Sequence, residues 1–268
     1  MTENWLEEKD DRRDKRKMPF ISFSQINKYL TCPESFRLYY IERLRLRIPK
    51  ANLVFGSLIH LSLSHLFNAK AEPVKFFSEV WDGLKQIELT YGKKDSWERL
   101  RACGVGLLTK FVAEEIPRIR SVKAVEKKFE LKISNLDLPL IGVIDLVAEV
   151  DETTKVIDFK TADKSYGPAD VVLSDQLTTY QLSEPQTDEL ALCVLVKTTE
   201  PRIEWHPTKR DSGRLAEFLD KAGYVAREIK AGQFYKRTGI HCNWCDFLPV
   251  CLGDKERTEE TLVQTGQS

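Results

Sequence analysis

Two apolar stretches joined by a short polar turn constrain the fold of this chain more than any other feature. The first, LPLIGVIDLVAEV (138–150), is an almost continuous apolar run, as expected of a buried central strand. The second, KVIDFK (155–160), has the length of a short strand, and DETT (151–154) between them is typical of a turn. We therefore expect a β-hairpin at the centre of a sheet.

Helical and strand patterns surround this hairpin. Apolar residues recur at three- and four-residue spacing through most of 54–120, which predicts a helical part, and they alternate in VEKKFELKI (125–133), which predicts a strand. Further along the chain, strands are expected at 189–197 and 202–206, and a helix at 171–183. A long amphipathic helix that carries apolar residues from Leu215 to Ile229 on one face is expected to end at Gly232. The order predicts an α/β fold with a mixed central sheet flanked by helices.

The start of the folded region has its own signals. Two short helices are expected within 22–44, because Ser22 or Ser24 suits a helix N-cap and Pro33 suits the first turn of a helix. Basic and apolar residues then alternate in RLRLRIPK (43–50), which predicts an extended segment with one basic face.

These elements predict one domain over residues 19–253, with its sheet at about 122–206. Residues 1–18 are densely charged and predict a flexible N-terminus, whereas 254–268 predict a polar tail. No apolar run approaches the roughly 20 residues of a membrane span, and no apolar segment of a secretory signal follows Met1. We therefore expect a cytoplasmic protein without a membrane partner.

Composition narrows the function only slightly. The 268 residues are 42% hydrophobic, which is enough for a sizeable core and argues against disorder throughout. The 41 basic and 41 acidic side chains give no net charge, which neither favours nor excludes a nucleic-acid partner, since a local basic groove suffices for phosphate contact. Cys103 and Cys193 lie in apolar stretches and are expected to be small core residues.

The hairpin carries an unusual polar trio, Asp145, Asp158 and Lys160. Asp158 and Lys160 share a strand face because they are two residues apart, and a hairpin brings Asp145 beside Asp158. Two close carboxylates repel, so a divalent cation between them is the natural resolution, and oxygen ligands favour Mg²⁺ or Mn²⁺. A lysine beside such a metal suits phosphodiester hydrolysis. The alternative is two surface acids and a solvated lysine, but a buried strand does not carry an unpaired Asp without cost.

Four cysteines stand in polar, turn-rich sequence. Cys242, Cys245 and Cys251 lie within ten residues, and Cys32 supplies a fourth thiol from the other end of the chain. Four thiolates suit Zn²⁺ or an iron–sulfur cluster, and ligand type alone leaves both open. Closely spaced cysteines in a reducing compartment are more typical of ligands than of free thiols.

Taken together, these residues resemble the PD-(D/E)XK nuclease superfamily. Ile144-Asp145 corresponds to the "PD", with Ile in place of Pro, and Asp158-Phe159-Lys160 corresponds to the "(D/E)XK". The RecB-like branch also has G-x-x-x-H upstream and Q-x-x-x-Y downstream, matched here by GSLIH (56–60) and QLTTY (176–180). The resemblance runs in family order from about residue 22 to 251.

The resemblance implies a restriction-endonuclease-like core with a helical insertion and a Cys-rich C-terminal segment. It also implies that His60 is a metal ligand, which shifts the preference towards Mn²⁺, and that Gln176 and Tyr180 lie beside the lysine and the DNA backbone. The alternatives are a histidine packed on a helix and an ordinary polar helix face. Glu126 is a further candidate for the acidic shell, or else a surface charge among lysines.

The cysteine pattern also resembles one branch of the superfamily. AddB-type nuclease domains and CRISPR-associated RecB-like exonucleases carry one cysteine before a proline near the N-terminus and C-x₂-C-x₅-C near the C-terminus. The resemblance thus implies a [4Fe-4S] cluster held by Cys32, Cys242, Cys245 and Cys251, with Zn²⁺ as the alternative.

The function implied is a metal-dependent DNA exonuclease acting on single-stranded ends, 5′ to 3′, in DNA repair, recombination, phage replication or CRISPR adaptation. A helicase, recombinase or integrase is the expected kind of partner. Arg99, Arg101 and Lys110 of the helical part are candidate DNA-backbone contacts, unless these helices only support the sheet. Two other readings stay open, a non-catalytic DNA-binding or scaffold subunit of a larger DNA-processing complex and a zinc-binding interaction module.

Overall fold

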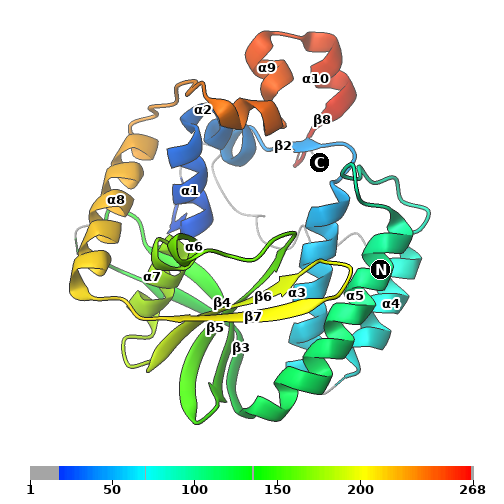
Figure 1. Cartoon of the computed structure of the whole chain (residues 1–268). Helices are drawn as coiled ribbons and strands as arrows, with labels where there is room; N and C mark the ends of the chain where they lie inside the picture. Colours follow the sequence, from blue (N-terminus) through cyan, green and yellow to red (C-terminus); the bar gives the residue numbers. More distant parts are fainter. Residues whose placement is uncertain (1–17, 70, 135, 267–268) are drawn as a thin grey trace. The chain divides into compact units, whose positions relative to one another are not determined.

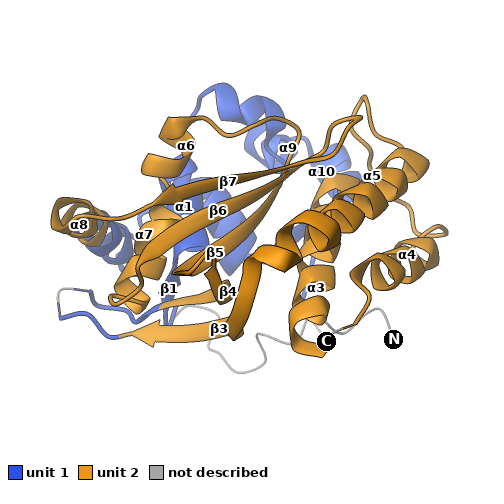
Figure 2. Ribbon diagram, turned by 60° about the horizontal axis from the view of Figure 1, so that its bottom comes forward, with its two compact units in different colours: residues 1–47, 132–140, 220–268 blue, residues 48–131, 141–219 orange. Residues whose placement is uncertain are grey.

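The structure is a computed structural model that describes residues 18–69, 71–134 and 136–266. The chain divides into two compact units (Figure 2). Unit 1 comprises residues 1–47, 132–140 and 220–268, and unit 2 comprises 48–131 and 141–219. Residues 1–18 are predicted to be flexible, but all of them except Met18 lie outside the described residues. The domain limits 19–253 remain a prediction.

Unit 2 contains a central sheet and its covering helices (Figure 1). Its elements are α3 (Ala51–Ala69), α4 (Pro73–Gly83), α5 (Trp97–Lys110), β3 (Ile119–Leu131), β4 (Leu140–Val150), β5 (Thr153–Ala162), α6 (Pro168–Val172), α7 (Asp175–Ser183), β6 (Glu189–Val196) and β7 (Arg202–Thr208). Helix α8 (Ser212–Lys230) starts in unit 2 and ends in unit 1. This mixed α/β architecture is the one expected from the sequence.

The predicted hairpin is confirmed. Strands β4 and β5 pair antiparallel from Leu146–Ile157 to Val150–Thr153, and the turn consists of Asp151 and Glu152. Both turn residues have positive φ, 50° and 68°, as a two-residue hairpin turn requires. Strand β3 also pairs with β4, whereas β6 runs parallel to β5 and antiparallel to β7. The sheet is therefore mixed, with β5 in its interior.

The helical part covers one face of the sheet. Helices α3, α4 and α5 lie together on this side (Figure 1), and aromatic side chains such as Phe55, Phe77 and Trp81 pack with Phe159 of β5 in one buried cluster. Gly104 allows the close contact between α4 and α5, because a Cβ at this position would lie 2.1 Å from the Phe77 ring. Cys193 is fully buried in this cluster and Cys103 packs against it, as expected.

The other face of the sheet is covered by α6 and α7. Val156 of β5 and Leu192 and Val194 of β6 form a second buried cluster with Leu177 and Tyr180 of α7. The sequence pattern predicted one helix over 171–183, and this prediction is wrong: α6 ends at Val172, and Ser174 caps the new helix α7. The serine side chain accepts a hydrogen bond from the backbone N–H of Leu177, which offsets the cost of starting a second helix.

Unit 1 is built from both ends of the chain. Its elements are β1 (Ile21–Ser22), α1 (Phe23–Thr31), α2 (Pro33–Phe36), β2 (Leu44–Leu46), a 3₁₀ turn at Ile240–Trp244, α9 (Leu248–Leu252), α10 (Lys255–Thr261) and β8 (Leu262–Gln264). Ser22 caps α1 in a capping box with Gln25, and Pro33 begins α2, as the sequence indicated.

The C-terminal part of unit 1 differs from the expected polar tail. Residues 255–261 form α10, capped by Asp254, and residues 262–264 form β8. Strand β8 pairs antiparallel with β2, which lies in the stretch predicted to be extended. Leu262 is the reason for this order, since it is 3% exposed and packs with Leu38 and Phe247.

Candidate active site

The hairpin brings the two predicted carboxylates together. Asp145 is the residue before Leu146, whose partner across the hairpin is Ile157, so Asp145 lies beside Asp158. Asp145 Oδ2 accepts a hydrogen bond of 2.8 Å from the backbone N–H of Phe159. This bond anchors the Asp145 carboxylate to the strand that carries the other acid.

Lys160 and Gln176 complete the site around Asp158. The Lys160 ammonium lies 2.7 Å from Asp158 Oδ2 and donates a hydrogen bond of 2.8 Å to Gln176 Oε1. The Gln176 amide in turn donates to Asp158 Oδ1 at 2.7 Å. A glutamine suits this place because it accepts from a cation with one end and donates to an anion with the other.

Tyr180 extends this network from one turn further along α7. Its hydroxyl accepts from Gln176 Nε2 at 2.9 Å and lies 2.8 Å from the Val143 carbonyl and 3.1 Å from Asp158 Oδ1, both of which are acceptors. Burial and the nearby Asp158 charge hold the pKa of Tyr180 well above its ordinary value, so this hydroxyl remains a donor. Sequence reasoning missed the Val143 carbonyl because no side-chain pattern marks a backbone acceptor.

Burial dominates the electrostatics of the site. Asp158 is 1% exposed, and its burial, opposed by Lys160 and reinforced by Asp145, raises the pKa of its carboxyl. Burial by itself would lower the pKa of Lys160, but the Asp158 carboxylate raises it instead. The lysine therefore carries its positive charge next to the acids.

Helix α3 supplies the histidine. Burial opposes a charge on His60, but its ring nitrogen Nδ1 lies 3.3 Å from Asp145 Oδ2, and the attraction of this acid raises the pKa of the imidazole. Gly56, one helical turn earlier, faces β5: a Cβ there would meet Thr161 Oγ1 at 3.0 Å. The absent side chain lets α3 lie close to the strand that carries Asp158 and Lys160.

The other charged candidates lie elsewhere. Glu126 is an exposed residue of β3 with a φ of 50°, and its membership of an acidic shell stays a prediction. The proposed DNA contacts in the helical part each pair with an acid: Arg99 with Asp95, Arg101 with Asp82 and Lys110 with Glu114. Such exposed ion pairs are weak, so the role of these cations in DNA contact stays a prediction.

A divalent cation is a chemical fit for this site. Among the described residues, no three His, Cys, Asp or Glu side chains are arranged to hold a metal ion. The buried Asp158 Oδ2 has the Lys160 ammonium 2.7 Å away but no other hydrogen-bond donor in the described part of the chain. Two carboxylates and an imidazole are donors that suit Mg²⁺ or Mn²⁺. The donor set thus matches the predicted cation.

A second group of candidate ligands lies within unit 1. The segment at residues 233–237 is held against α1 and α2, where Tyr29 donates to the Gln233 carbonyl at 2.6 Å and the Glu34 N–H donates to the Tyr235 carbonyl at 3.0 Å. These bonds bring the C-terminal cysteines towards Cys32 at the start of α2.

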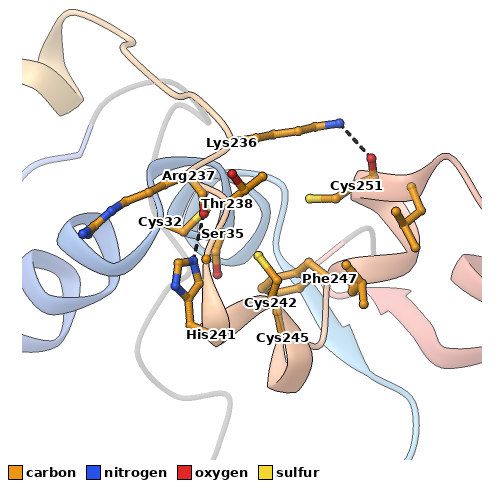
Figure 3. A pocket seen from close by; sticks show the side chains of 13 residues that line it. Cys32, Ser35, Lys236, Arg237, Thr238, His241, Cys242, Cys245, Phe247 and Cys251 are labelled. Atoms are coloured by element: carbon orange, nitrogen blue, oxygen red, sulfur yellow. Dashed lines mark hydrogen bonds between the residues drawn. The ribbon is translucent and has the colours of Figure 1, made fainter.

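All four predicted cysteines line one pocket (Figure 3). The pocket has a volume of about 240 Å³, and Cys32 reaches it from α1–α2 while Cys242, Cys245 and Cys251 reach it from the C-terminal segment. All four are free thiols, and Lys236 donates a hydrogen bond of 3.0 Å to the Cys251 carbonyl at the rim. Four thiols around one pocket match the donor set of a tetrathiolate group.

One protein family resembles this chain over most of its length. The sequence matches the family described as "PD-(D/E)XK nuclease superfamily" over residues 21–252. No curated protein sequence matches the chain significantly.

No helix in the described part of the chain is long and apolar enough to cross a membrane.

A solved structure shows a similar fold. A protein from Eubacterium rectale described as "Putative exonuclease" superposes with a TM-score of 0.55 at 10% identity, covering 85% of this chain and 87% of that one. The protein SSO0001 gives a TM-score of 0.43 at 15% identity, covering 88% and 87%. The family match spans both the hairpin and the cysteine segment, so this chain belongs to the PD-(D/E)XK nuclease superfamily.

Proposed function

We propose that this protein is a metal-dependent deoxyribonuclease whose catalytic residues are Asp145, Asp158 and Lys160. The observation that carries the proposal is the buried Asp158 carboxylate, which lies between a second carboxylate and a lysine that Gln176 binds. A fold alone needs none of these charges at the centre of its sheet, and burying them has a cost. The superfamily match supports the same conclusion.

Asp145 and Asp158, with His60, are the residues that would hold Mg²⁺ or Mn²⁺. A bound divalent cation lowers the pKa of an attacking water and offsets charge on the phosphoryl oxygens. Asp145 is kept in place by the Phe159 N–H and by His60 Nδ1. These two contacts leave the carboxylate oriented before substrate arrives, which reduces the reorganisation needed for reaction.

Lys160 has the substrate role in this proposal. Its side chain is partly exposed, with 29% accessible. Such a cation can hold a phosphate oxygen and orient the attacking water. The hydrogen bond to Gln176 holds the ammonium beside Asp158, and the bond from Gln176 to the Tyr180 hydroxyl holds the glutamine in place.

The substrate we propose is single-stranded DNA, degraded from an end with 5′ to 3′ polarity. The description of the Eubacterium rectale neighbour as an exonuclease supports action at ends, and the resemblance to RecB-like nucleases supports the strand preference. A helicase, recombinase or integrase acting on the same DNA is the partner we propose.

We further propose that Cys32, Cys242, Cys245 and Cys251 hold a [4Fe-4S] cluster. The common pocket of the four cysteines supports a shared group, because four thiols suit either an iron–sulfur cluster or Zn²⁺, and the resemblance favours the cluster. Because Cys32 and Cys242 stand far apart in sequence, the cluster would act as a staple of unit 1.

A nuclease assay with Mn²⁺ tests the proposed activity. The parallel substrates are linear single-stranded DNA labelled at either end, circular single-stranded DNA, duplex DNA and RNA. We expect stepwise loss from the 5′ end of linear single strands and resistance of the circle. Asp158→Ala and Lys160→Ala should each lower the rate at least about 100-fold, as expected when transition-state charge stabilisation is lost.

The matched control is Lys164→Ala, which removes an exposed lysine just after β5. This variant should keep the wild-type rate. Wild-type activity in Asp158→Ala or Lys160→Ala, with normal thermal unfolding, would refute the site, and tight DNA binding by an inactive wild type would instead support a scaffold role.

A further inference from the structure

Arg210 is buried between β7 and α8, where no contact with the proposed catalytic residues explains it. Its exposed fraction is 7%, and burial lowers the pKa of its guanidinium. All four of its described hydrogen bonds go to uncharged oxygens. The nearby Asp175 and Asp211 carboxylates favour its positive charge, although its hydrogen bonds go to neutral groups. Burying a cation is costly, so a residue that only filled this space would be apolar.

The four acceptors lie around the break between α6 and α7. The guanidinium donates to the carbonyls of Val171 and Ser174 at 2.9 and 3.1 Å and to the Thr178 hydroxyl at 3.0 Å. The fourth bond, of 2.8 Å, goes to the Thr208 hydroxyl at the end of β7. Arg210 thus connects the last turn of α6 and the first turn of α7 to the sheet.

Gln176 lies within the segment that Arg210 binds. Gln176 is the second residue of α7, and Ser174 and Thr178 stand on either side of it in the sequence. Its amide makes bonds of 2.8 and 2.7 Å to Lys160 and Asp158, and small displacements of α7 would lengthen both. A planar guanidinium with five donors can bridge several oxygens at once, whereas an ammonium cannot do so with the same geometry.

We propose that Arg210 is a positioning residue of the nuclease site, acting on the reaction through α7 and Gln176. The inference rests on the proposed nuclease function. The guanidinium binds the Val171 and Ser174 carbonyls, which stand on the two sides of the break between α6 and α7 and also accept backbone hydrogen bonds from Ser174 and Thr178. The proposed role gives a buried, charged residue a function at a distance from the reacting groups.

A double-mutant cycle tests this inference. Arg210→Met, Gln176→Ala and the double variant are compared with wild type in the Mn²⁺ nuclease assay, and thermal unfolding is recorded for each. We expect Arg210→Met to lower kcat about 10-fold with little change in KM, and to add less than about 2-fold in the Gln176→Ala background, because residues acting through one another are not additive. Arg214→Met, which removes an exposed arginine four residues later, should match wild type.

Arg210→Lys provides the second variant if Arg210→Met does not fold. It keeps the charge, so a role in bridging predicts that kcat still falls and stays coupled to Gln176. Equal losses in both backgrounds, or wild-type kcat in Arg210→Lys, would overturn the inference. A wild-type protein with no nuclease activity would instead refute the proposed function, so the failure of the inference and the failure of the proposed function are distinguishable.

Discussion

Lys160 and Gln176 are joined by a hydrogen bond of 2.8 Å, although one belongs to a strand and the other to a helix 16 residues later. The same glutamine donates to Asp158 at 2.7 Å. Gln176 thus lies between the cation and the anion of the site and keeps both side chains in place. Hydrogen bonds to charged groups contribute about 1.5–3 kcal/mol each, so this contact is large enough to affect catalysis.

Replacement of Gln176 by alanine should lower the rate of DNA hydrolysis about 10- to 100-fold with a smaller change in KM. The reason is that Lys160 and Asp158 lose the side chain that orients them, and with it one hydrogen bond to each charged group. The measurement is steady-state kinetics with Mn²⁺. Gln181→Ala is the control, since Gln181 lies on the same helix and its amide donates to the Glu184 carbonyl. Equal losses in both variants would contradict a specific role for Gln176.

Gly56→Ala should lower activity several-fold without unfolding the protein. The added Cβ would lie 3.0 Å from Thr161 Oγ1, so either the Thr161 side chain or α3 must give way, and a shift of α3 would carry His60 away from Asp145. Small displacements of catalytic groups have large effects on rate. Gly83→Ala is the control, because a Cβ at Gly83 meets no atom within 4 Å. A Gly56→Ala enzyme as active as Gly83→Ala would show that the approach of α3 is not critical.

Cys245→Ala should abolish the brown colour and iron content of anaerobically purified protein and lower its thermal stability. The proposed cluster closes the long loop between Cys32 and Cys242. By the chain-entropy argument for cross-links, loss of this closure removes stabilisation on the order of 5 kcal/mol. Absorption spectra and iron and zinc analysis make the measurement. Cys103→Ala, on helix α5, should keep the cluster because Cys103 does not line the pocket. Stoichiometric zinc without iron in the wild type would overturn the cluster proposal.

Ser22→Ala should lower the free energy of unfolding by about 1 kcal/mol while leaving hydrolysis per folded molecule unchanged. The substitution removes the capping box in which Ser22 and Gln25 bind each other's backbone N–H groups at the start of α1. Urea unfolding provides the measurement. Ser24→Ala, at an exposed position inside the helix, should be neutral or slightly stabilising because alanine is the better helix former. A larger loss in Ser24→Ala would contradict the assignment of Ser22 as the cap.

Prediction from the sequence succeeded where a local pattern has one physical solution. The hairpin at Asp151–Glu152 follows from two apolar strands separated by a polar turn, and Ser22 and Pro33 indicate where α1 and α2 begin. It failed where tertiary contacts outweigh local preference. The helix over 171–183 divides at Ser174, where the serine side chain caps the new helix and Arg210 binds the Ser174 carbonyl. The polar sequence at 255–261 becomes helical in a segment anchored by Leu262.

The sequence by itself determined which residues share a strand face, because the two-residue period of a strand places Asp158 and Lys160 together whatever surrounds them. It also determined the cysteine spacing. Only the tertiary structure decided that Gln176 bridges Lys160 and Asp158, that Gly56 lets α3 approach Thr161, and that four cysteines line one pocket. These relationships join segments far apart in the chain, and packing between elements, not local periodicity, sets the distances between them.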